Sequence, residues 1–156
     1  MSLAAEILEA ARARGVMIAT AESCTGGLIA GALTEVAGSS DAFDRGFVTY
    51  SNAAKQQMLG VRPETLAAHG AVSEEVAGEM AAGALRHSGA GLAVSVTGIA
   101  GPGGSEHKPE GRVCFGIAQP FGVETETVEF GAIGRHQVRA ATVDHALRLL
   151  LSALRG

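Results

Sequence analysis

The chain has 156 residues, of which 47% are apolar and 4% aromatic, so its core must consist mainly of small and branched aliphatic side chains. Its 16 acidic and 12 basic residues give a formal charge of −4, which argues against the broad basic face that nucleic-acid binding needs. The N-terminus lacks the pattern of a signal peptide, no apolar run reaches membrane-spanning length, and Cys24 and Cys114 are too few for a disulfide framework. We therefore expect one domain, residues 1–156, in the cytoplasm and without nucleic-acid or membrane partners.

Hydrophobic periodicity predicts helices that alternate with strands, followed by a late hairpin. The predicted helices cover residues 3–14, 25–36, 51–59, 72–87 and a C-terminal segment around 143–154, with a short helical turn at 62–65. The predicted strands cover residues 16–21, 47–50, 92–96, 112–118 and 123–130. The third of these is nearly all apolar and is expected at the centre of the sheet, whereas the last alternates with glutamates and is expected at an edge. This order predicts a three-layer α/β/α sandwich with a mixed, mostly parallel sheet.

Residues 20–27, with the sequence TAESCTGG, join the first predicted strand to the second predicted helix. The first amides of a helix have no partner within it and can donate to another molecule, and Gly26 and Gly27 would let that molecule approach the backbone. Ser23 can therefore be a nucleophile with an oxyanion site beside it, or simply the N-cap of the helix. Cys24 is a rival nucleophile, although a packed thiol is the simpler interpretation because no histidine partner is evident.

Lys55 falls near the start of the helix that Ser51 is expected to cap. The helix dipole and burial would both lower the pKa of its ammonium group, which favours a neutral amine that can accept a proton. If the first two strands are neighbours, Ser23 and Lys55 both emerge at the carboxyl ends of strands, where α/β folds bind ligands. A solvated surface lysine is the alternative. Tyr50 ends the same strand and can orient a proton or pack as a half-buried core residue.

A glycine-rich segment at residues 98–104 follows the third strand, and its amides can hold a phosphate or carboxylate. It matches neither the P-loop nor the dinucleotide-binding pattern, and a plain flexible connection is the alternative. Arg139 can pair with a phosphate or can face solvent on the last helix. The five histidines show no metal-binding spacing, so none is assigned to a metal.

Taken together, these segments resemble the CinA C-terminal domain family, the nicotinamide-nucleotide amidohydrolases (NMN deamidases). The matching runs keep the family's order along nearly the whole chain: residues 21–27, 38–40, 46–52 with Lys55, 69–73, and 95–102 through 108–109. The resemblance implies a stand-alone form of the domain, a sheet like that of anticodon-binding domains without RNA binding, and no cofactor. The chain departs from the family at Glu110, where a small apolar residue is more usual, and is only loosely similar over residues 131–139.

The resemblance further implies hydrolysis of nicotinamide mononucleotide to nicotinate mononucleotide and ammonia, a step of pyridine-nucleotide salvage in NAD metabolism, by a homodimer or higher homo-oligomer. The residues that match the family's site are, as catalytic groups, Ser23 as nucleophile, Lys55 as its base and Tyr50 assisting and, as substrate-binding groups, Thr25, Gly26, Ser40, Gly101 and Arg139. The alternative is a non-enzymatic nucleotide-binding protein linked to competence or the response to DNA damage. Saturable binding without chemical change would distinguish that alternative from the enzyme.

Overall fold

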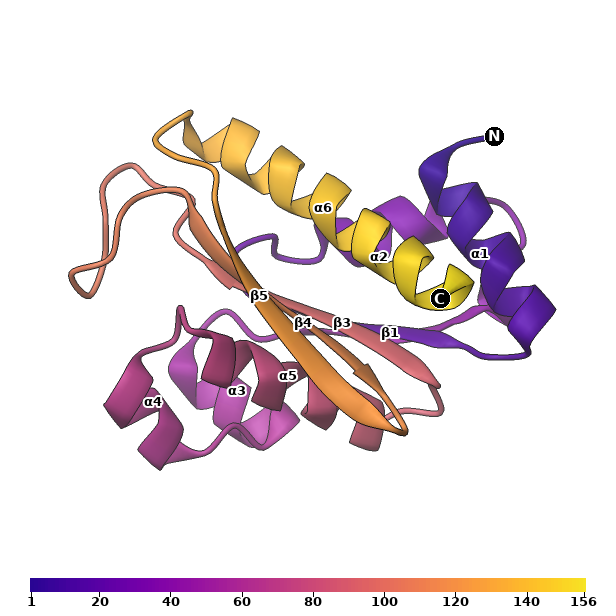
Figure 1. The fold of residues 1–156 in the computed structure, drawn as a ribbon, viewed down its shortest axis with the longest axis horizontal. Helices are drawn as coiled ribbons and strands as arrows, with labels where there is room; N and C mark the ends of the chain where they lie inside the picture. The colour runs from indigo at the N-terminus through magenta and orange to yellow at the C-terminus, as the bar shows by residue number, and fades with distance from the viewer.

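A five-stranded sheet with helices on both faces forms the frame of the molecule (Figure 1). The computed structural model describes residues 1–156, and its strands are β1 (Ile18–Glu22), β2 (Phe43–Val48), β3 (Leu92–Gly98), β4 (Arg112–Gln119) and β5 (Gly122–Glu129). They lie in the order β2-β1-β3-β4-β5, and β4 alone runs against the direction of the other four. The predicted three-layer fold with a mixed, mostly parallel sheet is confirmed, as are β3 at the centre and β5 at an edge.

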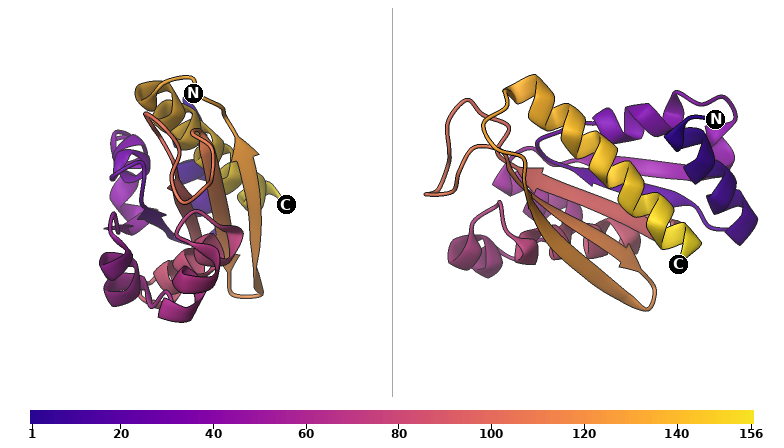
Figure 2. Two further views of the ribbon diagram at one scale, coloured as in Figure 1. Left: turned by 90° about the vertical axis from the view of Figure 1, so that its left-hand side faces the viewer. Right: turned by 45° about the horizontal axis from the view of Figure 1, so that its top comes forward.

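Two groups of helices cover the two faces of this sheet. The helices are α1 (Leu3–Arg14), α2 (Leu28–Thr34), α3 (Asn52–Leu59), α4 (Pro63–His69), α5 (Glu74–Arg86) and α6 (Arg135–Arg155), and a short 3-10 helix spans Ser39–Asp41. Helices α1, α2 and α6 pack on one face over a core cluster of 22 buried residues, and α3, α4 and α5 lie on the other face over a smaller cluster of 10 (Figures 1 and 2). No helix combines the length and apolarity that crossing a lipid bilayer requires.

Local capping explains where several helices begin and end. The side chains of Ser2, Ser51 and Ser73 each accept a hydrogen bond from the amide three residues later, so the caps predicted at Ser51 and Ser73 are confirmed. Gly15 ends α1 in the left-handed conformation that glycine adopts most readily. These local signals are strong because each satisfies backbone groups that would otherwise have no partner at a helix end.

Three predicted boundaries are wrong by several residues, and one of them is the start of α6, which lies at Arg135 instead of near residue 143. Helix α2 begins at Leu28 instead of residue 25, because Gly26 and Gly27 have positive φ values of 58° and 108°, which an α-helix does not contain. Strand β2 covers Phe43–Val48 instead of residues 47–50. It is the second edge strand and carries Asp44 and Arg45, so the apolar pattern does not mark its first half.

The topology places three chain segments at one edge of the sheet. Strands β1, β2 and β3 are mutually parallel, so their carboxyl ends point the same way. Ser23 directly follows β1, Thr49 directly follows β2, and the segment from Ile99 follows β3. Side chains that are distant along the chain therefore meet at this edge, as is usual for α/β sheets.

Candidate active site

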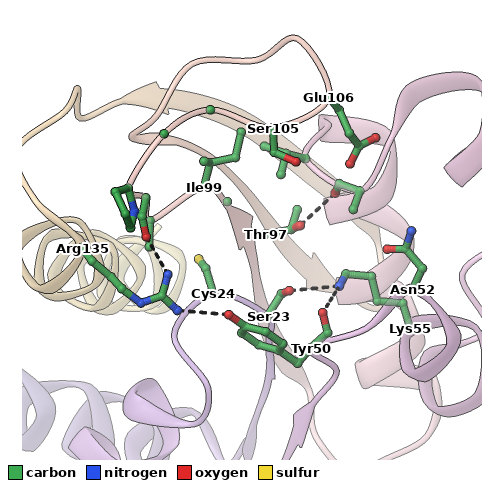
Figure 3. Close-up of a pocket in the computed structure, with 18 residues that line it drawn as sticks. Ser23, Cys24, Tyr50, Asn52, Lys55, Thr97, Ile99, Ser105, Glu106 and Arg135 are labelled. Atoms are coloured by element: carbon green, nitrogen blue, oxygen red, sulfur yellow. Dashed lines mark hydrogen bonds between the residues drawn. The ribbon is translucent and has the colours of Figure 1, made fainter.

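A cavity of about 320 Å³ opens at the carboxyl ends of β1, β2 and β3 (Figure 3). Its walls come from the segments after these strands and from the start of α6. The lining residues are Ser23, Cys24, Tyr50, Asn52, Lys55, Ala71, Val72, the continuous stretch from Thr97 to Glu106, and Arg135. Four of the predicted site residues, namely Ser23, Tyr50, Lys55 and Gly101, are therefore brought together in one cavity.

Ser23 and Lys55 contact each other directly, although 32 positions separate them in the sequence. The Nζ of Lys55 donates to the Oγ of Ser23 at 3.0 Å and also reaches the carbonyl oxygens of Thr49 at 2.9 Å and Tyr50 at 3.3 Å. The side chain of Lys55 is only 1% exposed, and no carboxylate forms an ion pair with it. The alternative of a solvated surface lysine is therefore wrong.

Burial controls the protonation of Lys55. Desolvation disfavours its ammonium form and lowers its pKa below the ordinary value of 10.5, while the neighbouring Cys24 acts weakly in the opposite direction. An amine with a lowered pKa in contact with a hydroxyl can accept that hydroxyl's proton. The pair has the composition of a serine nucleophile with a lysine base.

Cys24, the rival nucleophile, is a buried thiol. Burial raises its pKa to about 11, so the thiol stays protonated at neutral pH. Since a thiolate is the reactive form of cysteine, this environment makes Cys24 unreactive. The interpretation of Cys24 as a packed thiol agrees with the structure.

The buried side chain of Glu22 fixes the turn that contains Ser23. Its carboxylate accepts from the amides of Ile29 at 2.8 Å and Ala30 at 2.9 Å and from the hydroxyl of Thr25 at 2.6 Å. The N-cap of α2 is Gly27, so the alternative that Ser23 caps this helix is wrong. The expectation that the first helical amides remain free is also wrong, because Glu22 binds them and compensates the helix dipole.

Two other amides near Ser23 are available for the role that those helical amides were expected to play. The amides of Cys24 and Thr25 donate to no oxygen of the chain, whereas Ser23 donates to Val96 and Gly26 donates to Ser23. Both unpaired amides directly follow Ser23. They are therefore the nearest candidates for donors to an oxyanion.

Arg139 holds the same turn from the side of α6. Its Nε donates to the carbonyl of Cys24 at 3.1 Å, and its Nη2 donates to the carbonyl of Thr25 at 3.3 Å. Gly26 faces this guanidinium group, since a Cβ at Gly26 would lie 3.6 Å from Nη2. Thr25, Gly26 and Arg139 are thus brought together behind Ser23, and none of them lines the cavity.

Arg135 and Glu106 are charged cavity residues that the sequence analysis missed. The Nη1 of Arg135 donates to the carbonyl of Gly101 at 2.8 Å, and its Nη2 donates to the hydroxyl of Tyr50 at 3.1 Å (Figure 3). Arg135 precedes Arg139 by four positions, which puts both on one face of α6. The spacing of four positions from Arg139 is the sequence signal that could have identified Arg135, since the family resemblance is loose in this segment.

Ser40 lies away from the other predicted site residues. It is exposed in the 3-10 helix before β2, and that strand runs parallel to β1. A residue before β2 lies at the amino edge of the sheet, whereas Ser23 lies at the carboxyl edge. Within one chain, Ser40 does not line the cavity.

The segment between β3 and β4 is fixed by side-chain contacts, in contrast to the flexible connection considered from the sequence. The Nζ of Lys108 donates to the carbonyls of His69 and Val72, at 2.6 Å in each case. Glu110, the position that departs from the family, accepts from the amide of Gly103 at 2.6 Å. This wall of the cavity therefore has a defined shape.

Comparison with known proteins identifies relatives over nearly the whole chain. The family model described as the CinA C-terminal domain matches residues 1–154. A protein named nicotinamide-nucleotide amidohydrolase PncC, from Escherichia coli K12, is 53% identical over 151 residues, which cover 96% of this chain and 92% of that protein. A CinA-like protein from Chlorobium phaeobacteroides is 59% identical over 147 residues, and the chain spans only 35% of its length.

Solved structures agree with this assignment. The crystal structure of a competence damage-inducible protein A from Klebsiella pneumoniae superposes with a TM-score of 0.94 at 44% identity, covering 98% of this chain and 95% of the other. The crystal structure of a competence/damage inducible protein from Agrobacterium tumefaciens superposes with a TM-score of 0.88 at 54% identity, covering 97% and 96% of the two chains. Both likenesses include the elements that form the cavity.

Proposed function

The chain belongs to the CinA C-terminal domain family, and on that premise we propose that it hydrolyses nicotinamide mononucleotide to nicotinate mononucleotide and ammonia, a step of pyridine-nucleotide salvage. Residues 1–156 would form one amidohydrolase domain. The observation that carries the proposal is the 3.0 Å contact between Ser23 Oγ and the buried Nζ of Lys55. A primary carboxamide needs such a nucleophile and base, because its nitrogen must gain a proton before it leaves.

In the first half of the proposed reaction, neutral Lys55 accepts the proton of the Ser23 hydroxyl while Oγ forms a bond to the carboxamide carbon. The resulting ammonium group of Lys55 then gives this proton to the amide nitrogen. The carbon–nitrogen bond breaks, ammonia leaves, and the nicotinoyl group remains on Ser23 as an ester. The amides of Cys24 and Thr25 would stabilise the oxyanion of the tetrahedral intermediate.

In the second half, Lys55 accepts a proton from water while the water oxygen bonds to the ester carbon. The ester bond breaks, Lys55 returns the proton to Ser23, and nicotinate mononucleotide leaves. Because the carbonyls of Thr49 and Tyr50 also hold Nζ, the amine keeps one position through both halves.

The remaining site residues divide into three groups in this proposal. Arg135 would hold the phosphate of the substrate, since a guanidinium group pairs well with phosphate, and Gly101 would position Arg135 through its carbonyl. Tyr50 assists by holding Lys55 with its carbonyl and Arg135 with its hydroxyl. Thr25, Gly26 and Arg139 would act through the Ser23 turn, which they hold in place.

The alternative, a nucleotide-binding protein without catalysis, has less support. Burying an amine beside a serine without a carboxylate partner costs stability. Binding alone requires neither the buried amine nor its contact with a hydroxyl. A hydrolase requires both, so the Ser23–Lys55 pair favours the enzyme.

Two further proposals come with the family resemblance. We propose that the protein is a homodimer, which sedimentation equilibrium would test, with a single-chain mass as the contradicting result. We also propose a cytoplasmic location, where the buried thiols of Cys24 and Cys114 would remain reduced.

Ammonia release from nicotinamide mononucleotide, with NAD tested in parallel, is the direct test of the proposed function. The wild type should release one ammonia per mononucleotide consumed, and Ser23→Ala should lose about a thousandfold or more in kcat while remaining folded. Circular dichroism and thermal unfolding would establish that folding. Saturable binding of the mononucleotide without ammonia release would contradict the proposal and support the non-enzymatic alternative.

A further inference from the structure

Glu106 supplies the cavity's one carboxylate, and Arg135 its one guanidinium group. Both side chains are exposed, and the carboxylate of Glu106 forms no ion pair and accepts no hydrogen bond from the chain. In the view of Figure 3 they stand on opposite sides of Ser23, with Arg135 beside Tyr50 and Glu106 on the side of Lys55 and Asn52. The cavity therefore has a positive and a negative wall with the nucleophile between them.

The position of Glu106 is set by a tight turn. The backbones of Ser105 and Lys108 bond to each other in both directions, at 3.1 and 2.8 Å, and Glu106 lies between them with a φ of 51°. The side chain of Lys108 fastens this turn to the carbonyls of His69 and Val72. The carboxylate of Glu106 lies against the backbone of Gly70 and near the ammonium group of Lys108, since a Cβ at Gly70 would contact both, but it forms no ion pair or hydrogen bond with either.

The proposed substrate carries two charges that match these walls. Its phosphate is negative, its oxidised nicotinamide ring is positive, and the carboxamide that Ser23 attacks is neutral. Hydrolysis turns that carboxamide into a carboxylate, so the product gains a negative charge beside the ring. A carboxylate at the cavity would attract the ring of the substrate, whereas in the product the new negative charge beside the ring offsets that attraction.

We propose that Glu106 is a specificity-determining residue, which selects the positively charged, oxidised nicotinamide ring and distinguishes the substrate from the carboxylate product. This inference rests on the proposed function, because it takes the mononucleotide as the ligand. It adds a requirement that the chemistry at Ser23 does not impose. A neutral ring with the same carboxamide, as in reduced nicotinamide mononucleotide, would lack the attraction to Glu106.

The experiment compares Glu106→Gln with the wild type, both for turnover and for equilibrium binding in the Ser23→Ala background. Calorimetry would measure three ligands: oxidised mononucleotide, its reduced form and nicotinate mononucleotide. For charges in a solvated cavity we expect Glu106→Gln to weaken binding of the oxidised substrate by about threefold to tenfold and to change binding of the product by about twofold or less, because the product keeps the positive ring and has a negative carboxylate beside it. Affinity for the reduced form should stay unchanged, and all differences should shrink in 1 M salt, where screening is short-ranged, about 3 Å.

Two control variants separate this role from a general effect of charge or folding. Glu106→Asp keeps the charge and should retain the preference for the oxidised ring. Glu124→Gln removes an unpaired, exposed carboxylate on β5, outside this cavity, and should change none of the three affinities. A loss of loop structure would weaken substrate and product alike, so a loss of affinity confined to the oxidised substrate identifies a charge effect.

The outcomes also distinguish the two proposals. If the wild type releases no ammonia, the proposed function is wrong, and the binding measurements still test the recognition of ring charge. If the wild type releases ammonia but Glu106→Gln leaves the three affinities and the KM unchanged, the inference about Glu106 alone is wrong. Parallel changes for substrate and product would also overturn it.

Discussion

The floor and the rim of the cavity differ in how they treat charge. At the floor, Ser23 and Lys55 are 8% and 1% exposed, and the lysine contacts only uncharged oxygens. At the rim, Arg135 and Glu106 are exposed and keep their charges in contact with solvent. Burial lowers the pKa of an amine but would heavily penalise charged groups meant to recognise a ligand. In the proposed function, this difference corresponds to chemistry at the floor and recognition at the rim.

The two arginines of α6 repeat this division on a smaller scale. Arg139 is half-buried and binds the carbonyls of the Ser23 turn, whereas Arg135 reaches Gly101 and Tyr50 at the rim. Both have the same chemical group, and one helical turn separates them. In the proposed function, their contacts rather than their residue type suggest that Arg139 positions the nucleophile and that Arg135 binds the substrate.

Lys55→Met should have the largest effect of the variants compared here. Methionine fills a similar volume but cannot accept a proton, so we expect kcat to fall by about a thousandfold while KM changes little. Ammonia release under saturating substrate measures kcat, and circular dichroism checks the fold. Near-normal turnover by the folded variant would show that the reaction does not need Lys55, and it would contradict the proposed difference between the floor and the rim.

The pH dependence of the wild type follows from the same residue. Because the folded pKa of Lys55 lies below 10.5, the unfolded chain binds its proton first as the pH falls. The contribution of Lys55 to the free energy of unfolding is therefore largest above pH 10.5 and falls as the pH is lowered to the folded pKa, so the difference in free energy of unfolding between the wild type and Lys55→Met should follow this slope. Urea unfolding at a series of pH values measures it, and kcat/KM should rise with pH through the same folded pKa.

The arginine pair gives the next largest effects. Arg139→Ala should lower kcat by about tenfold to a hundredfold with little change in KM, because the Ser23 turn loses two hydrogen bonds.

Arg135→Ala should raise KM by about tenfold or more with a smaller change in kcat, because a phosphate partner is lost. Steady-state kinetics with Arg148→Ala, an exposed arginine paired to Asp144 on the same helix, would control for charge. Equal kcat and KM effects at both positions would contradict the division.

Local signals in the sequence were enough to predict most of the fold. Ser51 and Ser73 mark helix starts through side-chain bonds that depend only on neighbouring residues, and the alternation of β5 marks its exposed edge. Strand β2 was misplaced because an edge strand can carry Asp44 and Arg45 without cost to the core. Hydrophobic periodicity reflects which residues are buried, and the residues of β2 are little buried.

The site was harder to predict because it depends on contacts between distant segments. The family resemblance pointed to Ser23 and Lys55, but only the parallel pairing of β1 and β2 brings them within 3.0 Å. The resemblance assigned Arg139 to the substrate, whereas four positions on a helix decide which arginine reaches the cavity. Ser40 shows a different limit of prediction from the sequence. It matches the family's motif, but a motif does not state at which edge of the sheet a residue lies.

Tyr50→Phe should have the smallest effect and tests whether the floor and the rim act separately within one residue. The carbonyl of Tyr50 belongs to the floor, because it accepts from Lys55, while its hydroxyl belongs to the rim, because it binds Arg135. The substitution removes only the hydroxyl, from a side chain that is 62% exposed, so we expect KM to rise by about twofold to fivefold. The kcat and the midpoint of its pH profile should stay the same. If kcat instead fell by about a hundredfold, the hydroxyl would be transferring a proton at the floor, since a lost hydrogen bond to an exposed guanidinium group is too weak to change the rate that far.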